Sequence, residues 1–273
     1  MKKAHSKGNR RIADIPVVIF CGGRGSRLKE ETEVIPKPLV PIGERPILWH
    51  IMKIYYAQGF RRFILLLGYK GEKIKDYFCN YMLYTSDFTL SPHAHSAKAV
   101  YHQRPAEDWH ITFVETGLNT QTGGRLRQIE SYIKTPFFML TYGDGVGNVD
   151  LKKLMGTHRA KKRLVTMTGV FPPSRFGEVL IEKGEVIGFN EKPARTDVLV
   201  NSGFYAVDRK IFQSLRDDDS LNFEKEVLPS LAERGQLSVY PHDGYWQCMD
   251  TIRDMEVLQS EWEGRTAPWK VWR

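Results

Sequence analysis

The sequence predicts an α/β fold in which a mainly parallel central sheet is flanked by helices. Strand-like and helix-like segments alternate along most of the 273 residues, which is the order that builds parallel sheets. Continuous apolar runs, such as residues 63–67, are typical of strands that are buried on both faces. The chain is 41% hydrophobic, so it can bury a sizeable core.

The first half of the chain supplies the expected elements in order. Strands are expected at residues 17–20, 63–67, 111–114 and 137–141. Helices are expected at residues 46–58, 71–82 and 122–133, with Pro46 in the first turn of the first helix and Gly59 at its end. Residues 86–110 are less regular. Their histidines fit no zinc-ligand spacing, so we expect a solvated loop or hairpin there.

The second half continues the alternation. Strands are expected at residues 164–171, 178–181, 186–190 and 202–207, and helices at 223–234 and 251–263. No linker rich in proline, glycine or serine interrupts the sequence, and no internal repeat is visible. We therefore expect one domain over residues 15–273, preceded by a flexible basic extension at residues 1–14.

Charge and cysteine content narrow the possible function classes. The net charge is +8, but residues 1–14 hold five basic side chains and one acid, which is half of this excess. No basic stripe with interleaved aromatics is present, which argues against nucleic-acid binding. No apolar stretch is long enough for a membrane helix. Three cysteines without metal-like spacing favour a reducing, cytoplasmic location.

The most informative motif follows the first expected strand. Residues 22–28 read GGRGSRL, and Lys37 lies between two prolines shortly beyond them. Glycines allow backbone amides to close around an anion, and Arg24, Arg27 and Lys37 add positive charge. The spacing matches neither a Walker loop nor a dinucleotide-binding fingerprint. We interpret the segment as a site for a nucleoside triphosphate, while the glycines taken alone also suit a tight turn.

Two aspartates are candidate ligands for magnesium. Asp144 follows the expected strand at residues 137–141 between two glycines, and acids at such strand ends face the ligand crevice. Mg²⁺ prefers one or two carboxylates together with substrate oxygens. Asp250, just before the last expected helix, is the second candidate. The alternative roles are a turn residue for Asp144 and a helix N-cap for Asp250.

The second half also carries residues suited to a sugar phosphate. Residues 191–193 read EKP, whose lysine suits a second phosphate and whose carboxylate suits sugar hydroxyls, although such a tripeptide also fits a surface turn. Asn201, Gly203 and Gly177 offer an amide and accessible backbone to a hexose. Trp246 suits either stacking on a sugar face or a place in the core.

Together these motifs resemble the sugar-1-phosphate nucleotidylyltransferases. The resemblance runs from residue 17 to residue 272 and includes GGRGSRL, PKPLVPIGERPILWHIMKIY, GYKGEKIKDYF, TGGRLRQ, TYGDGV, FPPSRFG, NEKP, NSGFY, YWQCMDT and APWKVW. The segments WHIMK, TYGDG and APWK are similar to the cytidylyl branch. The resemblance implies a Rossmann-like, mixed and mainly parallel sheet of the nucleotide-diphospho-sugar transferase type.

The family pattern implies roles for individual residues. Arg27, Lys37 and Asp144 would be catalytic, and Asp144 and Asp250 would bind Mg²⁺. The residues that hold the sugar phosphate would be Gly177, Glu191, Lys192, Asn201 and Gly203. The residues that bind the nucleotide would be Phe20, Cys21, Gly22, Gly23, Arg24, Gly25, Ser26, Arg27, Thr120, Gly123 and Arg125.

The implied reaction joins CTP and α-D-glucose 1-phosphate to give CDP-glucose and pyrophosphate by in-line attack, with the nucleotide in the first half of the chain and the sugar in the second. One alternative is an enzyme of the same type that uses another nucleobase or another phosphorylated acceptor. The other is a catalytically silent regulator that binds a nucleotide sugar. Ser202 and Cys248 depart from the family pattern near the expected sugar pocket, so the sugar stays open. The resemblance also implies a homo-oligomer. The aromatic tail either packs on a neighbouring subunit or folds back on its own chain.

Overall fold

The structure is a computed structural model that describes residues 11–25, 28, 32–91, 98–103, 107–172, 177–191 and 198–272. Within these residues, a seven-stranded sheet has the order β14-β10-β13-β8-β1-β4-β7. β1 (Pro16–Phe20) pairs in parallel with β4 (Arg62–Leu67) and with β8 (Phe137–Tyr142), and β4 pairs in parallel with β7 (His110–Glu115).

The other half of the sheet contains its antiparallel strand. β10 (Val165–Val170) pairs in parallel with β14 (Leu237–His242). β13 (Val200–Asp208) lies between β10 and β8 and is antiparallel to both. The prediction of a mixed, mainly parallel sheet is therefore confirmed.

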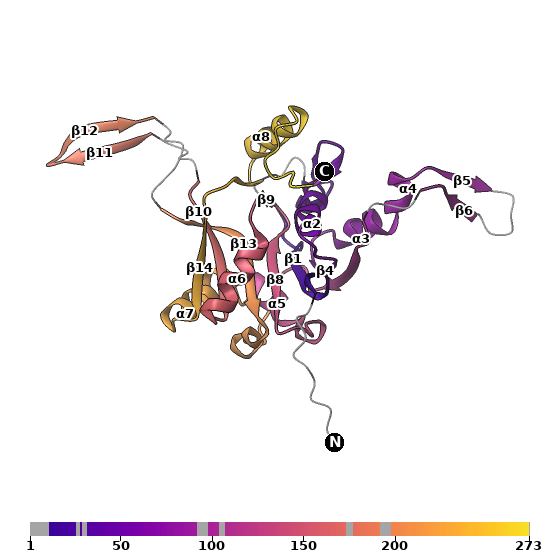
Figure 1. Ribbon diagram of the computed structural model, residues 1–273, viewed down its shortest axis with the longest axis horizontal. Coiled ribbons are helices and arrows are strands. Elements are labelled where there is room, and N and C mark those ends of the chain that lie inside the picture. The colour runs from indigo at the N-terminus through magenta and orange to yellow at the C-terminus, as the bar shows by residue number, and fades with distance from the viewer. Residues whose placement is uncertain are drawn as a thin grey trace, which may run out of the picture.

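Helices cover both faces of the sheet (Figure 1). One buried cluster joins the sheet to α2 (Ile47–Ala57), α6 (Leu151–Lys161) and α8 (Ile252–Glu263). A second cluster joins the opposite face to α5 (Thr122–Arg127), to a π-helix labelled η6 (Phe223–Val227) and to α7 (Leu228–Glu233).

Strand β1 shows how the sequence supplies both layers. Val17 and Ile19 belong to the first cluster, and Val18 and Phe20 belong to the second. All four side chains are buried. Successive side chains of a strand point to opposite faces, so an uninterrupted apolar run is required where both faces are covered.

Short elements complete the described part of the chain. They are the helical turns η1 (Ile12–Asp14), η3 (Lys37–Leu39), η4 (Glu130–Tyr132) and η5 (Arg209–Ser214), the helices α3 (Gly71–Cys79) and α4 (Tyr81–Thr85), and the paired strands β2 (Pro41–Ile42) with β3 (Arg45–Pro46) and β9 (Gly145–Gly147) with β15 (Trp246–Cys248). None of the helices in the described ranges has the length and apolar character of a membrane span.

Three of the expected helices are interrupted. The one expected at residues 122–133 ends as α5 at Arg127 and is followed by the separate turn η4. The other two breaks have identifiable reasons. The helix expected at residues 71–82 breaks at Asn80, whose backbone N–H and side-chain amide both donate to the carbonyl of Asp76, at 3.0 and 2.9 Å. The helix expected at residues 223–234 begins as the π-helix η6. Pro229, in the first turn of α7, has no N–H to donate to the carbonyl of Lys225, which favours the wider turn.

Two hairpins project from opposite ends of the molecule (Figure 1). β5 (Phe88–Ser91) pairs antiparallel with β6 (Lys98–Tyr101), which confirms the expected hairpin in the described part of residues 86–110. β11 (Glu178–Glu182) pairs antiparallel with β12 (Glu185–Asn190). The second hairpin exposes Val179, Leu180, Ile181, Val186, Ile187 and Phe189.

The aromatic tail folds back on its own chain. Trp269 is fully buried and its indole N–H donates to Nδ1 of His50 on α2 at 3.4 Å. The rings of Trp262 and Trp272 also pack on His50, with centroid distances of 4.5 and 6.1 Å. The tail and α8 are thereby held against the first half of the chain.

Candidate active site

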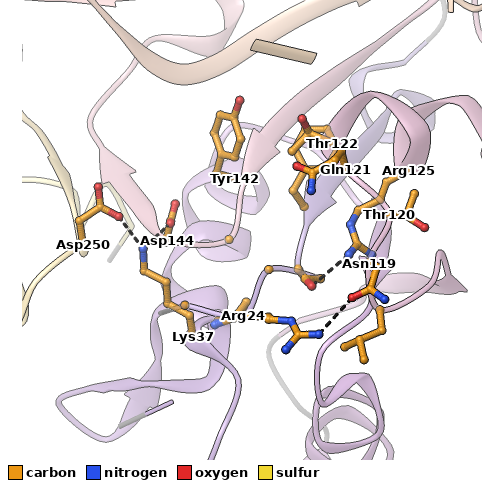
Figure 2. Close-up of a pocket in the computed structure, with 18 residues that line it drawn as sticks. Arg24, Lys37, Asn119, Thr120, Gln121, Thr122, Arg125, Tyr142, Asp144 and Asp250 are labelled. Atoms are coloured by element: carbon orange, nitrogen blue, oxygen red, sulfur yellow. Dashed lines mark hydrogen bonds and ion pairs between the residues drawn. The ribbon is translucent and has the colours of Figure 1, made fainter. Parts of the chain in front are cut away.

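A cavity of about 580 Å³ opens at the carboxyl ends of β1 and β8 (Figure 2). Open α/β sheets bind their ligands at such strand ends. Most of the predicted nucleotide and metal residues line it: Phe20, Cys21, Gly22, Gly23, Arg24, Gly25, Lys37, Thr120, Arg125, Asp144 and Asp250. The structure thus brings together residues that lie up to 230 positions apart in the sequence.

The glycine loop forms one wall of the cavity. Its glycines have no side chains, so the backbone at these positions is open to the cavity. Gly25 has a φ of 63°, which L-residues other than glycine rarely adopt. A Cβ on Gly22 would lie 2.2 Å from Nη1 of Arg125, so a side chain there would displace the guanidinium from its hydrogen bonds. The carbonyl of Gly22 accepts hydrogen bonds from Nη2 of Arg125 at 3.1 Å and from the backbone N–H of Tyr69 at 3.2 Å.

Arg125 connects the glycine loop to neighbouring elements by hydrogen bonds. Its buried guanidinium also donates to the carbonyl of Leu67 at 2.8 Å and to the hydroxyl of Thr116 at 2.6 Å. These bonds connect α5, β4 and the glycine loop. Gly123 does not line the cavity, because it is buried where a Cβ would lie 2.7 Å from Leu221.

Lys37 lies between the two acids (Figure 2). Its Nζ is 2.7 Å from Oδ2 of Asp144 and 2.7 Å from Oδ1 of Asp250. Burial alone lowers the pKa of Lys37, but the charges and hydrogen bonds of Asp144 and Asp250 outweigh this and raise it above its usual value. The ammonium is therefore charged at neutral pH, and both carboxylates face one cationic position.

A short two-stranded sheet brings the acids together. β9 and β15 pair antiparallel, with Gly145 opposite Cys248, and the N–H of Met249 donates to the carbonyl of Asp144 at 2.8 Å. The N-cap of α8 is Thr251, in a capping box with Asp254. The alternative of an N-cap role for Asp250 is therefore wrong, and its side chain instead contacts Lys37.

Cys248 lies beside this cluster. Its Sγ is 3.8 Å from Oδ2 of Asp250. Burial and the carboxylates of Asp250 and Asp144 raise the pKa of the thiol to about 11. At neutral pH it is therefore a neutral, half-buried thiol that adds no charge to the cluster.

Two residues of β13 that were predicted to bind the sugar phosphate, Asn201 and Gly203, lie next to the cavity. Asn201 accepts a hydrogen bond from the N–H of Gly203 at 2.9 Å and donates to the hydroxyl of Tyr205 at 2.5 Å. Gly203 has a φ of 81°, and a Cβ there would lie 2.4 Å from the ring of Tyr142, which lines the cavity. The buried hydroxyl of Ser202 donates to the carbonyl of Thr168 at 2.9 Å, so it is used inside the sheet.

The remaining predicted sugar residues lie apart from the cavity. Gly177 and Glu191 are at the base of the β11–β12 hairpin, where a Cβ on Gly177 would be 3.1 Å from Oε2 of Glu191. The indole N–H of Trp246 donates to the carbonyl of Ser202 at 2.8 Å, and its ring packs against the core. Three other predicted residues, Ser26, Arg27 and Lys192, fall outside the described residues.

Several lining residues were not predicted from the sequence. They are Pro38, Leu118, Asn119, Gln121, Thr122, Tyr142 and Gly143. Asn119 accepts a hydrogen bond from Arg24 at 3.0 Å, which links the glycine loop to the segment before α5. Tyr142 and Gly143 directly precede Asp144, so their position in the TYGDG motif was an available signal.

Comparison with known proteins agrees with this geometry. A family model described as nucleotidyl transferase matches residues 16–261. The chain belongs to the nucleotidyl transferase family. It is 45% identical over 256 residues to the glucose-1-phosphate cytidylyltransferase of Salmonella typhi, covering 93% of this chain and 98% of that protein. It is 44% identical over 255 residues to the probable glucose-1-phosphate cytidylyltransferase of Bacillus subtilis, covering 93% of this chain and 99% of that protein.

A solved structure shares this fold. HddC from Yersinia pseudotuberculosis superimposes with a TM-score of 0.67 and 25% sequence identity. The match covers 91% of this chain and 99% of HddC. The expected mixed sheet of the nucleotidyl transferase type is therefore confirmed both by the family and by its solved structures.

Proposed function

We propose that the protein transfers a cytidylyl group from CTP to α-D-glucose 1-phosphate, giving CDP-glucose and pyrophosphate. The observation that carries the proposal is the Lys37, Asp144 and Asp250 cluster, which closes one end of the glycine-loop cavity. The cluster provides the charged groups that nucleotidyl transfer needs beside a cavity large enough for a nucleotide. The names of the 44–45% identical relatives support the choice of CTP and glucose 1-phosphate.

The carboxylate pair fits Mg²⁺. Within the described residues, no group of three His, Cys, Asp or Glu side chains is arranged to hold a metal. Mg²⁺ commonly takes only one or two carboxylates and completes its shell with water and substrate phosphates. Asp144 and Asp250, which face one cationic position, are the residues that would hold it. Bound there, the ion would neutralise phosphate charge and orient the reacting groups.

The reaction requires correct positioning of the substrates and stabilisation of charge, but it does not require a general base. An oxygen of the sugar phosphate forms a bond to the α-phosphorus of CTP while the bond to pyrophosphate breaks on the opposite side. The attacking oxygen is already an anion, so no proton has to be removed. Lys37, with Arg27, stabilises the charge on the triphosphate. This proposal assigns the sugar phosphate to Asn201, Gly203, Gly177, Glu191 and Lys192.

The test is a nucleotide panel measured by pyrophosphate release. Mg²⁺ and glucose 1-phosphate are supplied with CTP, UTP, dTTP, ATP or GTP in separate reactions. Release with CTP and formation of CDP-glucose are expected. Release only with another nucleotide would overturn the choice of base. No release with any of the five, repeated with other sugar phosphates, would favour a nucleotide-sugar-binding regulator.

We also propose that the protein forms a homo-oligomer through the β11–β12 hairpin. This hairpin has only one strand pair and exposes six apolar side chains, as described above. A two-stranded hairpin is marginally stable in water without further packing. Large apolar side chains gathered on an exposed element are typical of sites of protein association. A second copy of the chain is the occupant that this proposal assigns to the hairpin.

A further inference from the structure

Glu224 connects two side chains in the wall of the cavity. Its Oε2 accepts a hydrogen bond from the hydroxyl of Thr122 at 2.6 Å, and its Oε1 accepts one from the hydroxyl of Tyr142. Thr122 and Tyr142 both line the cavity and lie near each other in Figure 2. Glu224 comes from η6, about 80 to 100 residues further along the chain.

These bonds determine the polarity of the Thr122 hydroxyl. Its single proton is donated to Glu224, and one of its oxygen lone pairs accepts the backbone N–H of Phe223 at 3.0 Å. A hydroxyl has one proton and two lone pairs. The group that remains for a ligand is therefore a lone pair, so Thr122 can accept a hydrogen bond from a ligand but cannot donate one.

A fixed acceptor distinguishes the pyrimidine bases. Cytosine carries an exocyclic amine, which donates hydrogen bonds, where uracil and thymine carry a carbonyl oxygen, which accepts them. An acceptor in the protein that faces this position attracts cytosine and repels the other two bases. A site built around such a polar group strongly rejects a ligand that lacks the matching group, because the polar group of the protein is then left unpaired.

We propose that Thr122 reads the exocyclic amine of the nucleobase and that Glu224 is the positioning residue that keeps Thr122 an acceptor. This inference rests on the proposed function, since it assumes that the cavity holds the base of CTP. It assigns base selection to two residues that belong to none of the phosphate-binding motifs.

The surrounding structure holds Glu224 in place. It lies in the first turn of η6, which is capped by the side chain of Asn222. The bond from Tyr142 orients the carboxylate from a second direction, and Tyr142 is also within 3.3 Å of the hydroxyl of Tyr205. The hydroxyl of Tyr205 in turn accepts a hydrogen bond from the side-chain amide of Asn201, which is one of the residues predicted to bind the sugar phosphate. The carboxylate is therefore the second member of a hydrogen-bond chain that runs from Thr122 through Tyr142 and Tyr205 to Asn201.

The test compares base preference in four variants. The measured quantity is kcat/KM with CTP divided by kcat/KM with UTP, both with glucose 1-phosphate. Thr122→Val removes the acceptor, and Glu224→Leu releases the Thr122 proton so that the hydroxyl can donate to a carbonyl. Both should lower the ratio at least about tenfold. Thr122→Ser keeps the hydroxyl and should preserve the ratio.

The matched control is Glu226→Leu. Glu226 lies in the same π-helix but is exposed and pairs with Arg216 at 2.7 Å, away from the cavity. It reports any general disturbance of η6, which would change turnover without changing the ratio. Thermal unfolding checks that each variant is folded. For a variant that has lost turnover, the affinities for CTP and UTP are measured by calorimetry, and their ratio is compared with the same ratio for the wild type.

The outcomes separate this inference from the proposed function. An unchanged ratio in folded Thr122→Val and Glu224→Leu, with a wild type that uses CTP, overturns the assignment of Thr122 and Glu224 alone. A wild type that does not use CTP overturns the proposed function. A wild type that prefers UTP overturns both, because a fixed acceptor beside the uracil carbonyl is repulsive.

Discussion

Nζ of Lys37 lies 2.7 Å from Oδ1 of Asp250, although the two residues are 213 positions apart. The contact joins the segment after the glycine loop to the residue that precedes α8. The same ammonium contacts Asp144 at 2.7 Å, so three charged side chains meet at one point. The charge of Lys37 therefore supports both the geometry of the site and the chemistry proposed for it.

Loss of Lys37 should abolish most of the activity. We expect Lys37→Ala to lower turnover at least about a hundredfold, as is typical when a partner of transition-state charge is removed. Pyrophosphate release with CTP and glucose 1-phosphate measures the effect. Lys161→Ala, at the exposed end of α6, is the control and should leave turnover unchanged. Near-wild-type turnover of a folded Lys37→Ala protein would refute the assigned role, and Asp144→Ala should behave as Lys37→Ala does.

Gly143 should be intolerant of any side chain. A Cβ there would lie 2.9 Å from the carbonyl oxygen of Phe20 and 3.0 Å from Cγ of Pro38, so the turn that carries Asp144 must move. We expect Gly143→Ala to lower turnover at least about tenfold, since small misplacements of reacting groups are costly. Gly156→Ala is the matched control in open space on α6, and it should raise the unfolding free energy by about 0.5–1 kcal/mol. Equal activity of the two variants would contradict the packing argument.

The glycine loop, Lys37 and Asp144 could be predicted because each belongs to a compact motif next to a strand. Strands such as residues 63–67 could be predicted because they are apolar runs buried on both faces. The edge strand β14 was missed, because it is only partly buried and carries no such run. Local patterns also located Asp250, but they did not separate its role from that of Thr251, since either residue type caps helices.

The contacts of Glu224 could not be predicted from the sequence. Its partners Thr122 and Tyr142 lie 102 and 82 residues away, and no local pattern couples them. Helix α6 was also missed, although its buried residues Leu151, Leu154, Met155 and His158 recur at helical spacing and Asp150 caps it. Local periodicity was therefore an available signal for α6, whereas only tertiary packing brings Glu224 to its partners.

The apolar β11–β12 hairpin should control self-association. We expect Ile181→Lys together with Ile187→Lys to shift an oligomer towards the monomer, because both side chains are largely exposed in the single chain and charges oppose their burial between copies. Sedimentation velocity measures the distribution. A pair of substitutions on the other exposed hairpin, Leu90→Lys with Val100→Lys, tests whether the effect is specific to β11–β12. A wild type that is monomeric at all concentrations would contradict the proposed assembly.

The buried His50 should make the unfolding free energy fall in mild acid. Burial lowers the pKa of His50 to about 4, and the ring is neutral because the Trp269 N–H donates to Nδ1 while Nε2 contacts the carbonyl of Ile42 at 2.9 Å. The folded pKa lies below the unfolded value of 6.5. Stability from the neutral ring is therefore complete above about pH 6.5 and is lost as the pH falls towards about 4.

The size and the control of this effect follow from the same contacts. A shift from 6.5 to about 4 corresponds to a loss on the order of 3 kcal/mol at the acid limit. Urea unfolding between about pH 7.5 and about pH 4.5, of wild type and of His50→Gln, isolates this contribution from other titrating groups. The advantage of the wild type should shrink steadily with acid, whereas the exposed His102→Gln variant should follow the wild type. A difference between wild type and His50→Gln that does not change with pH would show that His50 binds a proton equally well in the folded and unfolded chains.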